Sequence, residues 1–141
     1  MSKFSIFYNN IQGNRVEVSS SVPTTLYQCM DLAYLWVFIN DIPKATIQQA
    51  RAKDVYLRPN ALTRQYFEII KNTPSFIPKT GDLCVFNIGA VGHISIATGE
   101  GNLVTFKSFD QNWGSGTAKY PRIHVHHYDN DQLLGVLRIK K

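Results

Sequence analysis

Cys29, His93 and Asp110 are the residues of this 141-residue chain best suited to act together in catalysis. Cys29 is predicted in the first turn of a helix, where free N–H groups and the helix dipole favour the nucleophilic thiolate. A histidine can take and return the proton, and a carboxylate can bind its far ring nitrogen and fix the tautomer. This set fits a cysteine hydrolase that attacks a carbonyl group. The residue types alone fit equally well with Cys29 as a small buried hydrophobe.

Three more polar or aromatic residues lie beside these. Asn112 follows Asp110 by two positions, so strand alternation predicts that both side chains point toward the histidine. Gln28 precedes the cysteine and is a candidate oxyanion donor, together with the backbone N–H of the cysteine itself. Trp113 is a candidate wall of a substrate groove, and a place in the core is the alternative.

The cysteine needs a buried helix to carry it. That helix is predicted to begin near Thr24 or Thr25, because either hydroxyl can cap its N-terminus. Apolar residues occur on all its faces, which places it inside a domain, and it is predicted to end at residues 40–41. Other elements predicted in the first half are residues 3–8 (a short strand or helix), 44–51 (a helix) and 60–72 (a helix capped by Asn60).

The second half of the chain reads as strands separated by turns, most of which contain glycine. The predicted strands are residues 83–88, 93–98, 103–109, 123–128 and 133–139. Alternation places His93, Ser95 and Ala97 on one face and Ile94 and Ile96 on the other. Helices followed by strands predict an α+β domain, with helices packed against one face of a mainly antiparallel sheet. We expect the cysteine helix to lie across the face that holds His93.

Length and composition predict a single domain over residues 1–141 that buries a core without disulfides. Two cysteines in apolar segments indicate free thiols in a reducing compartment. The N-terminus lacks the features of a signal peptide, and no apolar run is long enough to cross a membrane. A net charge of +5 favours an anionic partner. The basic residues are scattered and RNA-binding motifs are missing, so the diffuse charge suits an anionic bacterial wall equally well. An ordinary solvated surface also explains it.

Several other reactive side chains have simpler explanations. Cys84 is predicted to pack inside a buried strand. His124 and His126 share a strand face, as a pair of zinc ligands does, but no third ligand is evident and a polar strand face is favoured. Residues 129–131 are predicted to form a turn.

Four segments resemble the CHAP family, the cysteine, histidine-dependent amidohydrolases/peptidases found in phage endolysins. They are residues 27–32, 81–83, 92–96 and 109–114, and residues 52–54 are also similar to a family segment. The resemblance extends over residues 3–139. It implies a papain-like fold and cleavage of amide bonds in peptidoglycan. It also implies that Cys29 is the nucleophile, His93 the base, Asp110 the orienting acid and Asn112 an additional polar member.

The chain departs from the family pattern at two places. Many relatives have glutamate in place of Asp110, which is one methylene shorter. Some phage relatives bind calcium through a carboxylate-rich loop before the cysteine, whereas residues 19–25 contain no carboxylate. We therefore expect no metal ion and no other cofactor.

The resemblance implies the catalytic domain of a phage-type endolysin. An endopeptidase acting between D-alanine and the cross-bridge is preferred over an N-acetylmuramoyl-L-alanine amidase, although no residue separates them. The expected partner is Gram-positive peptidoglycan, reached from the host cytoplasm once a membrane pore opens, with no nucleic acid or membrane partner. The chain can be a fragment of a longer lysin with a wall-binding domain, or a tail-associated hydrolase. The alternatives are a non-catalytic wall-binding module and a zinc hydrolase using His124, His126 and a cysteine.

Overall fold

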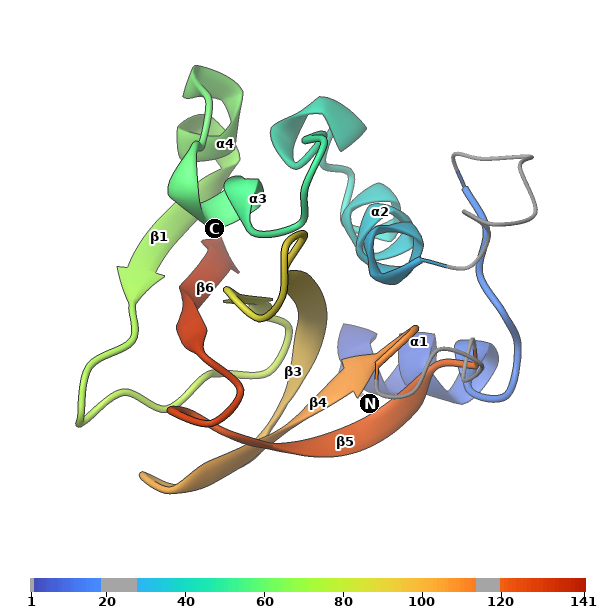
Figure 1. The fold of residues 1–141 in the computed structure, drawn as a ribbon. Helices are drawn as coiled ribbons and strands as arrows, with labels where there is room; N and C mark the ends of the chain where they lie inside the picture. The colour runs from blue at the N-terminus through green and yellow to red at the C-terminus, as the bar shows by residue number, and fades with distance from the viewer. Residues whose placement is uncertain (1, 19–27, 114–119) are drawn as a thin grey trace.

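A computed structural model describes residues 2–18, 28–113 and 120–141 of the chain (Figure 1). Helices come first and strands follow, which confirms the α+β class. The helical elements are α1 (Lys3–Ile11), α2 (Cys29–Ile39), the 3-10 turn η2 (Lys44–Thr46), α3 (Asp54–Leu57) and α4 (Ala61–Tyr66). The strands are β1 (Phe67–Lys71), β2 (Leu83–Phe86), β3 (His93–Gly101), β4 (Thr105–Asp110), β5 (Arg122–His127) and β6 (Leu133–Ile139).

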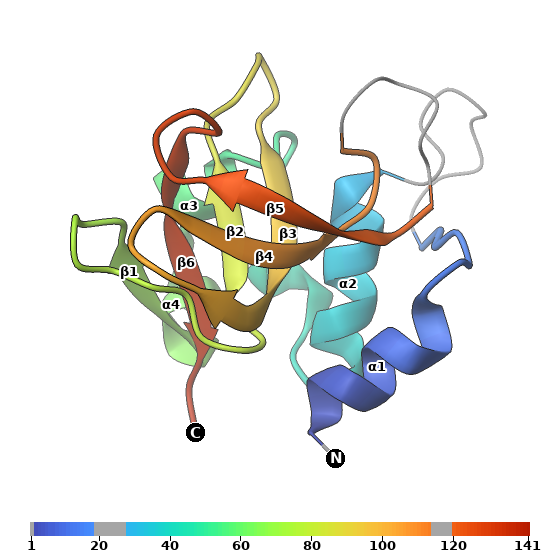
Figure 2. The same ribbon diagram turned by 90° about the horizontal axis from the view of Figure 1, so that it is seen from below.

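The six strands form one sheet in the order β1-β6-β2-β3-β4-β5, and every neighbouring pair is antiparallel. The sheet is strongly twisted, so that β4 and β5 run across β2 and β3 in Figure 2. None of the helices in the described part of the chain is both long and apolar enough to cross a bilayer.

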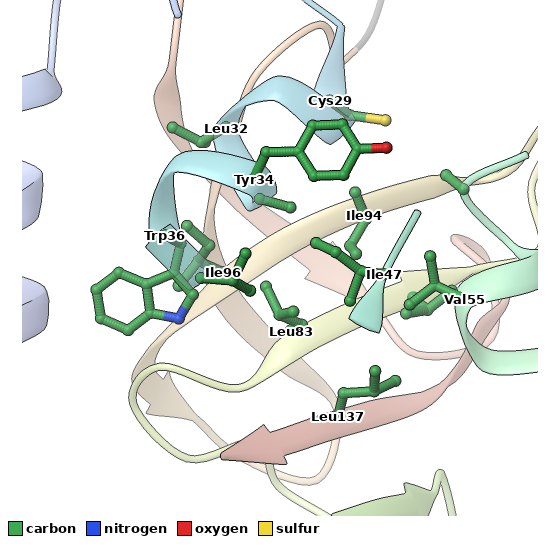
Figure 3. Packing of buried hydrophobic residues seen from close by; sticks show 14 of the residues in the cluster. Cys29, Leu32, Tyr34, Trp36, Ile47, Val55, Leu83, Ile94, Ile96 and Leu137 are labelled. Atoms are coloured by element: carbon green, nitrogen blue, oxygen red, sulfur yellow. The ribbon is translucent and has the colours of Figure 1, made fainter. Parts of the chain in front are cut away.

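Helix α2 packs on the face of the sheet formed by Ile94 and Ile96, where it contributes Leu32 and Trp36 to the main core (Figure 3). The opposite face has its own smaller core, which includes Phe86 beside the His93 ring. The prediction that the cysteine helix lies across the His93 face is therefore wrong. A helix that is apolar on every side gains most by covering the fully apolar face of β3, and that is the isoleucine face.

Residues 44–72 also differ from the predicted elements. Residues 44–51 form only the single turn η2, and the helix predicted over residues 60–72 ends at Tyr66. Its start is as predicted, because the Asn60 side chain accepts a hydrogen bond from Thr63 N at 2.8 Å. Strand β1 replaces the remainder and pairs with β6. The β-branched Ile69 and Ile70 favour that pairing over a further helical turn.

Candidate active site

Cys29 is the first residue of α2, with Gln28 in extended conformation at the N-cap position. The Asp31 carboxylate stabilises this start by accepting hydrogen bonds from Gln28 N at 2.9 Å and Val18 N at 3.2 Å. The helix thus begins later than predicted, and Thr24 and Thr25 lie outside the described residues. The Cys29 thiol is free and buried at the N-terminal start of the helix, where backbone N–H groups lack helical partners.

A sharp turn delivers His93 to the start of β3. Gly92 adopts a φ of +82°, and a Cβ there would lie 2.6 Å from both the Phe86 carbonyl oxygen and Lys53 Cβ. Lys53 N donates to Val91 O at 3.0 Å and fixes the turn from the other side. Only glycine fits this position, so the local chain path determines where the histidine stands.

His93 is held between the cysteine and a carboxylate. Its Nε2 lies 2.6 Å from Asp110 Oδ2, so Nδ1 is the ring nitrogen left for Cys29, whose thiol is near enough to raise the pKa of His93. Burial by itself lowers the pKa of His93. The hydrogen bonds to Asp110 and Cys29 outweigh burial and raise that pKa from 6.5 to about 9. The imidazolium form is therefore stabilised in the site.

Asp110 is fully buried at the end of β4 and is surrounded by donors. Its Oδ1 accepts from Ser108 Oγ at 2.5 Å, and Oδ2 lies 3.0 Å from His126 Nε2 as well as close to His93. Burial alone would raise the pKa of Asp110, but the neighbouring imidazoles of His124, His126 and His93 hold it well below the usual value. His124 Nδ1 lies 3.8 Å from Asp110 Oδ1, which is too long for a hydrogen bond. Asp110 is thus an ionised carboxylate.

Asn112 does not meet His93. Strand β4 ends at Asp110, and Asn112 has a φ of +61°, so the alternation that predicted its direction no longer applies. Its Nδ2 donates instead to Gln28 Oε1 at 3.0 Å. The prediction that Asn112 points toward the histidine is wrong, and the structure places this amide beside the candidate oxyanion residue.

Gln111 is a buried residue that the sequence did not single out. Its side chain accepts from Val16 N at 2.8 Å and donates to Val16 O at 2.8 Å and to Gln28 O at 2.9 Å. It therefore ties the segment after α1 to the N-cap of the cysteine helix. The only sequence signal was its position inside the segment 109–114 that resembles the CHAP family.

Trp113 is half-buried and lies against the histidines. Its ring centroid is 4.7 Å from that of His93 and 4.7 Å from that of His126. The half-buried indole thus packs against both imidazole rings.

The prediction that His126 lies on a polar strand face is wrong, because its side chain is fully buried. By contrast, His127 is exposed and the His124 side chain is 27% exposed. Both ring nitrogens of His126 bind carboxylates, so the residue cannot ligate zinc without losing one of these partners. No group of three or more histidine, cysteine, aspartate or glutamate side chains in residues 2–18, 28–113 and 120–141 is arranged to hold a metal ion. The carboxylate-free loop of residues 19–25 lies outside these ranges.

The remaining predictions for reactive side chains agree with the structure. Cys84 is fully buried in β2, and burial, helped by repulsion from Asp82 and Asp110, raises the pKa of its thiol well above the usual value. Residues 129–131 form a turn between β5 and β6. The chemistry available to the site is therefore that of the Cys29 thiol at the start of α2, the His93 imidazole and the ionised Asp110 carboxylate.

Comparison with known proteins gives related sequences but no family profile that matches the chain. Over 119 residues the chain is 34% identical to the probable autolysin PH of Staphylococcus aureus. This match covers 74% of this chain and 24% of the autolysin. Over 65 residues it is 40% identical to endolysin LysK of Staphylococcus phage K, covering 44% of this chain and 13% of the endolysin. The matched regions amount to about a quarter or less of each relative.

Two solved structures, one of them of an endolysin, have the same fold. The structure of the wild-type endolysin LysIME-EF1 superimposes with a TM-score of 0.63 at 26% identity, covering 99% of this chain and 65% of that one. The structure of Ly7917 superimposes with a TM-score of 0.65 over 98% of this chain and 63% of that one, and at 16% identity it bears on the fold alone. The predicted papain-like α+β fold is confirmed.

Proposed function

We propose that this chain is the catalytic domain of a CHAP-type peptidoglycan hydrolase, in which Cys29, His93 and Asp110 perform the reaction. The observation that carries the proposal is the continuous line from the thiol at the start of α2, through the His93 ring, to the buried Asp110 carboxylate at 2.6 Å. Sequence similarity to an autolysin and an endolysin supports a bacterial wall as the target.

The reaction begins with a thiolate–imidazolium pair between Cys29 and His93. The thiolate attacks the carbonyl carbon of the scissile amide, a C–S bond forms, and the carbonyl electrons move to oxygen. When this oxyanion collapses, the C–N bond breaks and His93 gives its Nδ1 proton to the leaving amine. His93 then takes a proton from water, which attacks the thioester, and the carboxylate product leaves as the thiol is restored.

Asp110 orients His93 and stabilises its charge. Because Nε2–H donates to the carboxylate, Nδ1 is the nitrogen directed to the thiol. Asp110 lies in a fully buried position, where attraction between opposite charges is stronger than in water. Asp110 is one methylene shorter than the glutamate of many relatives, but its Oδ2 still lies 2.6 Å from His93 Nε2.

Gln28 is the proposed oxyanion donor, with the backbone N–H of Cys29 as its partner. The Gln28 Oε1 atom accepts from Asn112 Nδ2 at 3.0 Å, so the Nε2 amide is the end left to donate to a developing negative charge. Asn112 is thus a positioning residue for the oxyanion donor. In this proposal it is not the orienting group of the histidine.

The substrate bond is a peptidoglycan amide of a Gram-positive wall, and we propose the D-alanyl to cross-bridge bond over the N-acetylmuramoyl-L-alanine bond. The net charge of +5 suits a wall that carries anionic polymers. The protein would act after a membrane pore admits it from the host cytoplasm. Mass spectrometry of digested peptidoglycan identifies the bond from the new termini.

The proposal is tested by turbidity loss of purified staphylococcal walls. Wild-type protein should lyse the walls, and Cys29→Ala or a thiol alkylator should abolish lysis with the fold intact by circular dichroism. Cys84→Ala is the matched control, because that thiol lies in the core and should be dispensable. Normal lysis by Cys29→Ala refutes the nucleophile. Wall binding by the wild type without lysis favours the non-catalytic module.

A further inference from the structure

A row of alternating imidazole and carboxylate groups extends beyond Asp110, and all of it is buried except the partly exposed Asp131. His93 Nε2 lies 2.6 Å from Asp110 Oδ2, and His126 Nε2 lies 3.0 Å from the same oxygen. The other nitrogen of His126, Nδ1, lies 2.8 Å from Oδ2 of Asp131 in the turn after β5. Asp131 Oδ2 also accepts from the backbone N–H of His127 at 3.2 Å. Four side chains thus form one connected network.

The hydrogen bonds determine the protonation of His126. An ionised carboxylate can only accept hydrogen bonds, so a ring nitrogen that faces one must carry a proton. Both nitrogens of His126 face carboxylates, and donors hold the pKa of Asp110 well below its usual value. His126 therefore meets a carboxylate with each of its two ring nitrogens, and it can donate to both at once only when both nitrogens carry a proton.

The surroundings of His126 would make a positive charge on its ring strong and local. Its ring is fully buried, and the rings of Phe86, Phe106 and Trp113 pack around it with centroids 4.6, 5.5 and 4.7 Å away. A buried cation is stable only when it is paired, and the two carboxylates provide that pairing. The other titratable rings nearby are those of His93 and His124, at centroid distances of 6.5 and 6.4 Å.

We infer that His126, held by Asp131, is a positioning residue that keeps Asp110 in place and limits how tightly His93 holds its proton. This inference deepens the proposed function and rests on it for the role in hydrolysis. His126 shares Asp110 Oδ2 with His93, so it fixes that oxygen from the far side. Its positive charge also opposes the charge on His93 and offsets part of the attraction from Asp110. His93 must both stabilise the thiolate and release its proton to the leaving amine, and the opposing charge assists the second step.

Histidine-ring ¹⁵N NMR of the full chain tests the inference without any substrate. At pH 8, where a free histidine side chain is neutral, His126 should show two protonated ring nitrogens. In His126→Gln the amide keeps a donor for Asp110 but has no charge. The pH at which His93 loses its proton should then rise from about 9 by roughly one to two units, because two charges about 6.5 Å apart repel at an effective dielectric constant near 20.

Two further variants complete the design. Asp131→Asn removes the carboxylate that keeps His126 charged, so it should shift His93 in the same direction and serves if His126→Gln does not fold. His127→Gln is the matched control on the same strand, and it should change neither the His93 titration nor the lysis rate. We expect wall lysis by His126→Gln to fall about tenfold, as the proton leaves His93 less readily.

Three results overturn the inference: a neutral His126 at pH 8, an unchanged His93 titration in both folded variants, or the same shift in the His127 control. Loss of lysis with an unchanged titration assigns His126 a structural role only. If wild-type protein does not lyse walls, the proposed function fails, and the titration still decides whether His126 sets the proton affinity of His93.

Discussion

Replacing Asp110 by alanine is the most informative single change in this site. The variant removes the acceptor for His93 Nε2 at 2.6 Å and leaves the ring held by Cys29 and by packing against Trp113. The imidazolium then loses its nearest counter-charge, and the ring loses the contact that selects Nδ1 for the thiol. Both effects reduce the fraction of molecules that hold the reactive ion pair.

The size of the loss follows from the pKa of His93. A rise from 6.5 to about 9 corresponds to roughly 3 kcal/mol in favour of the imidazolium, or a factor of a few hundred. Cys29 supplies part of that preference and Asp110 the rest. With the cost of misorientation added, Asp110→Ala should lyse walls about ten- to a thousandfold more slowly.

The pH dependence has a defined sign. Because folding raises the pKa of His93, the stability that its protonation contributes is fully present below about pH 6.5 and is lost as the pH rises through about 9. Wild-type lysis should fall over the upper part of that range, as the imidazolium disappears. In Asp110→Ala this fall should begin nearer pH 6.5.

Initial rates of turbidity loss on one wall preparation, with circular dichroism as a folding check, measure the effect. Asp110→Asn serves as a second variant. It keeps the side-chain volume and one acceptor oxygen, whereas alanine would leave both Ser108 and His126 without their acceptor. The reasoning is refuted if folded Asn112→Ala loses more activity than Asp110→Ala. Asn112 would then be the more important polar member despite its contact with Gln28.

Three other changes test separate parts of the molecule. Gln28→Ala should slow lysis by about a hundredfold as an oxyanion donor, and Asn112→Ala, which only positions that donor, by roughly three- to tenfold; equal rates for wild type and Gln28→Ala would remove the donor role. Lysis in EDTA should match lysis in calcium, since residues 19–25 have no carboxylate, and a loss that calcium restores would contradict this. Arg138→Ala should lower the free energy of unfolding, measured in urea, by about 2–4 kcal/mol. The variant leaves the buried Asp82 carboxylate without the Arg138 guanidinium, whose Nε and Nη2 donate to it at 2.9 and 2.7 Å. A change below about 1 kcal/mol would show that the pair adds little.

The α+β class, a helix that carries the cysteine and most strands were predictable from the sequence, because they depend on local patterns. The start of that helix was not, because it lies at Cys29 and not near Thr24 or Thr25. Period-two alternation in β3 correctly separated Ile94 and Ile96 from His93. The contact between Asp110 and His93 was also predictable, since both lie at the ends of neighbouring strands in the segments that resemble the CHAP family. The roles of these residues in hydrolysis remain predictions.

Other features depend on contacts that no local pattern contains. Residues 67–71 look like a continuation of α4, although Ile69 and Ile70 favour a strand, and they form β1 by pairing with β6, far along the chain. Asn112 left the expected face because the strand ended two residues earlier. His126 resembled a polar strand residue, and its burial depends on Asp131 in the following turn and on Asp110 from the neighbouring strand.

The Gln111 side chain also has a consequence for how the protein is made. It binds Val16 and Gln28, which are 95 and 83 residues away in the sequence. The N-terminal start of α2 therefore acquires its final support only after Gln111 has been synthesised. Contacts between distant segments are slow to form, because closing a long loop costs entropy. At about 5–20 residues per second, translation separates Gln28 from Gln111 by roughly 4 to 17 seconds. For most of that interval neither His93 nor Asp110 has been synthesised, so Cys29 has neither of these side chains beside it.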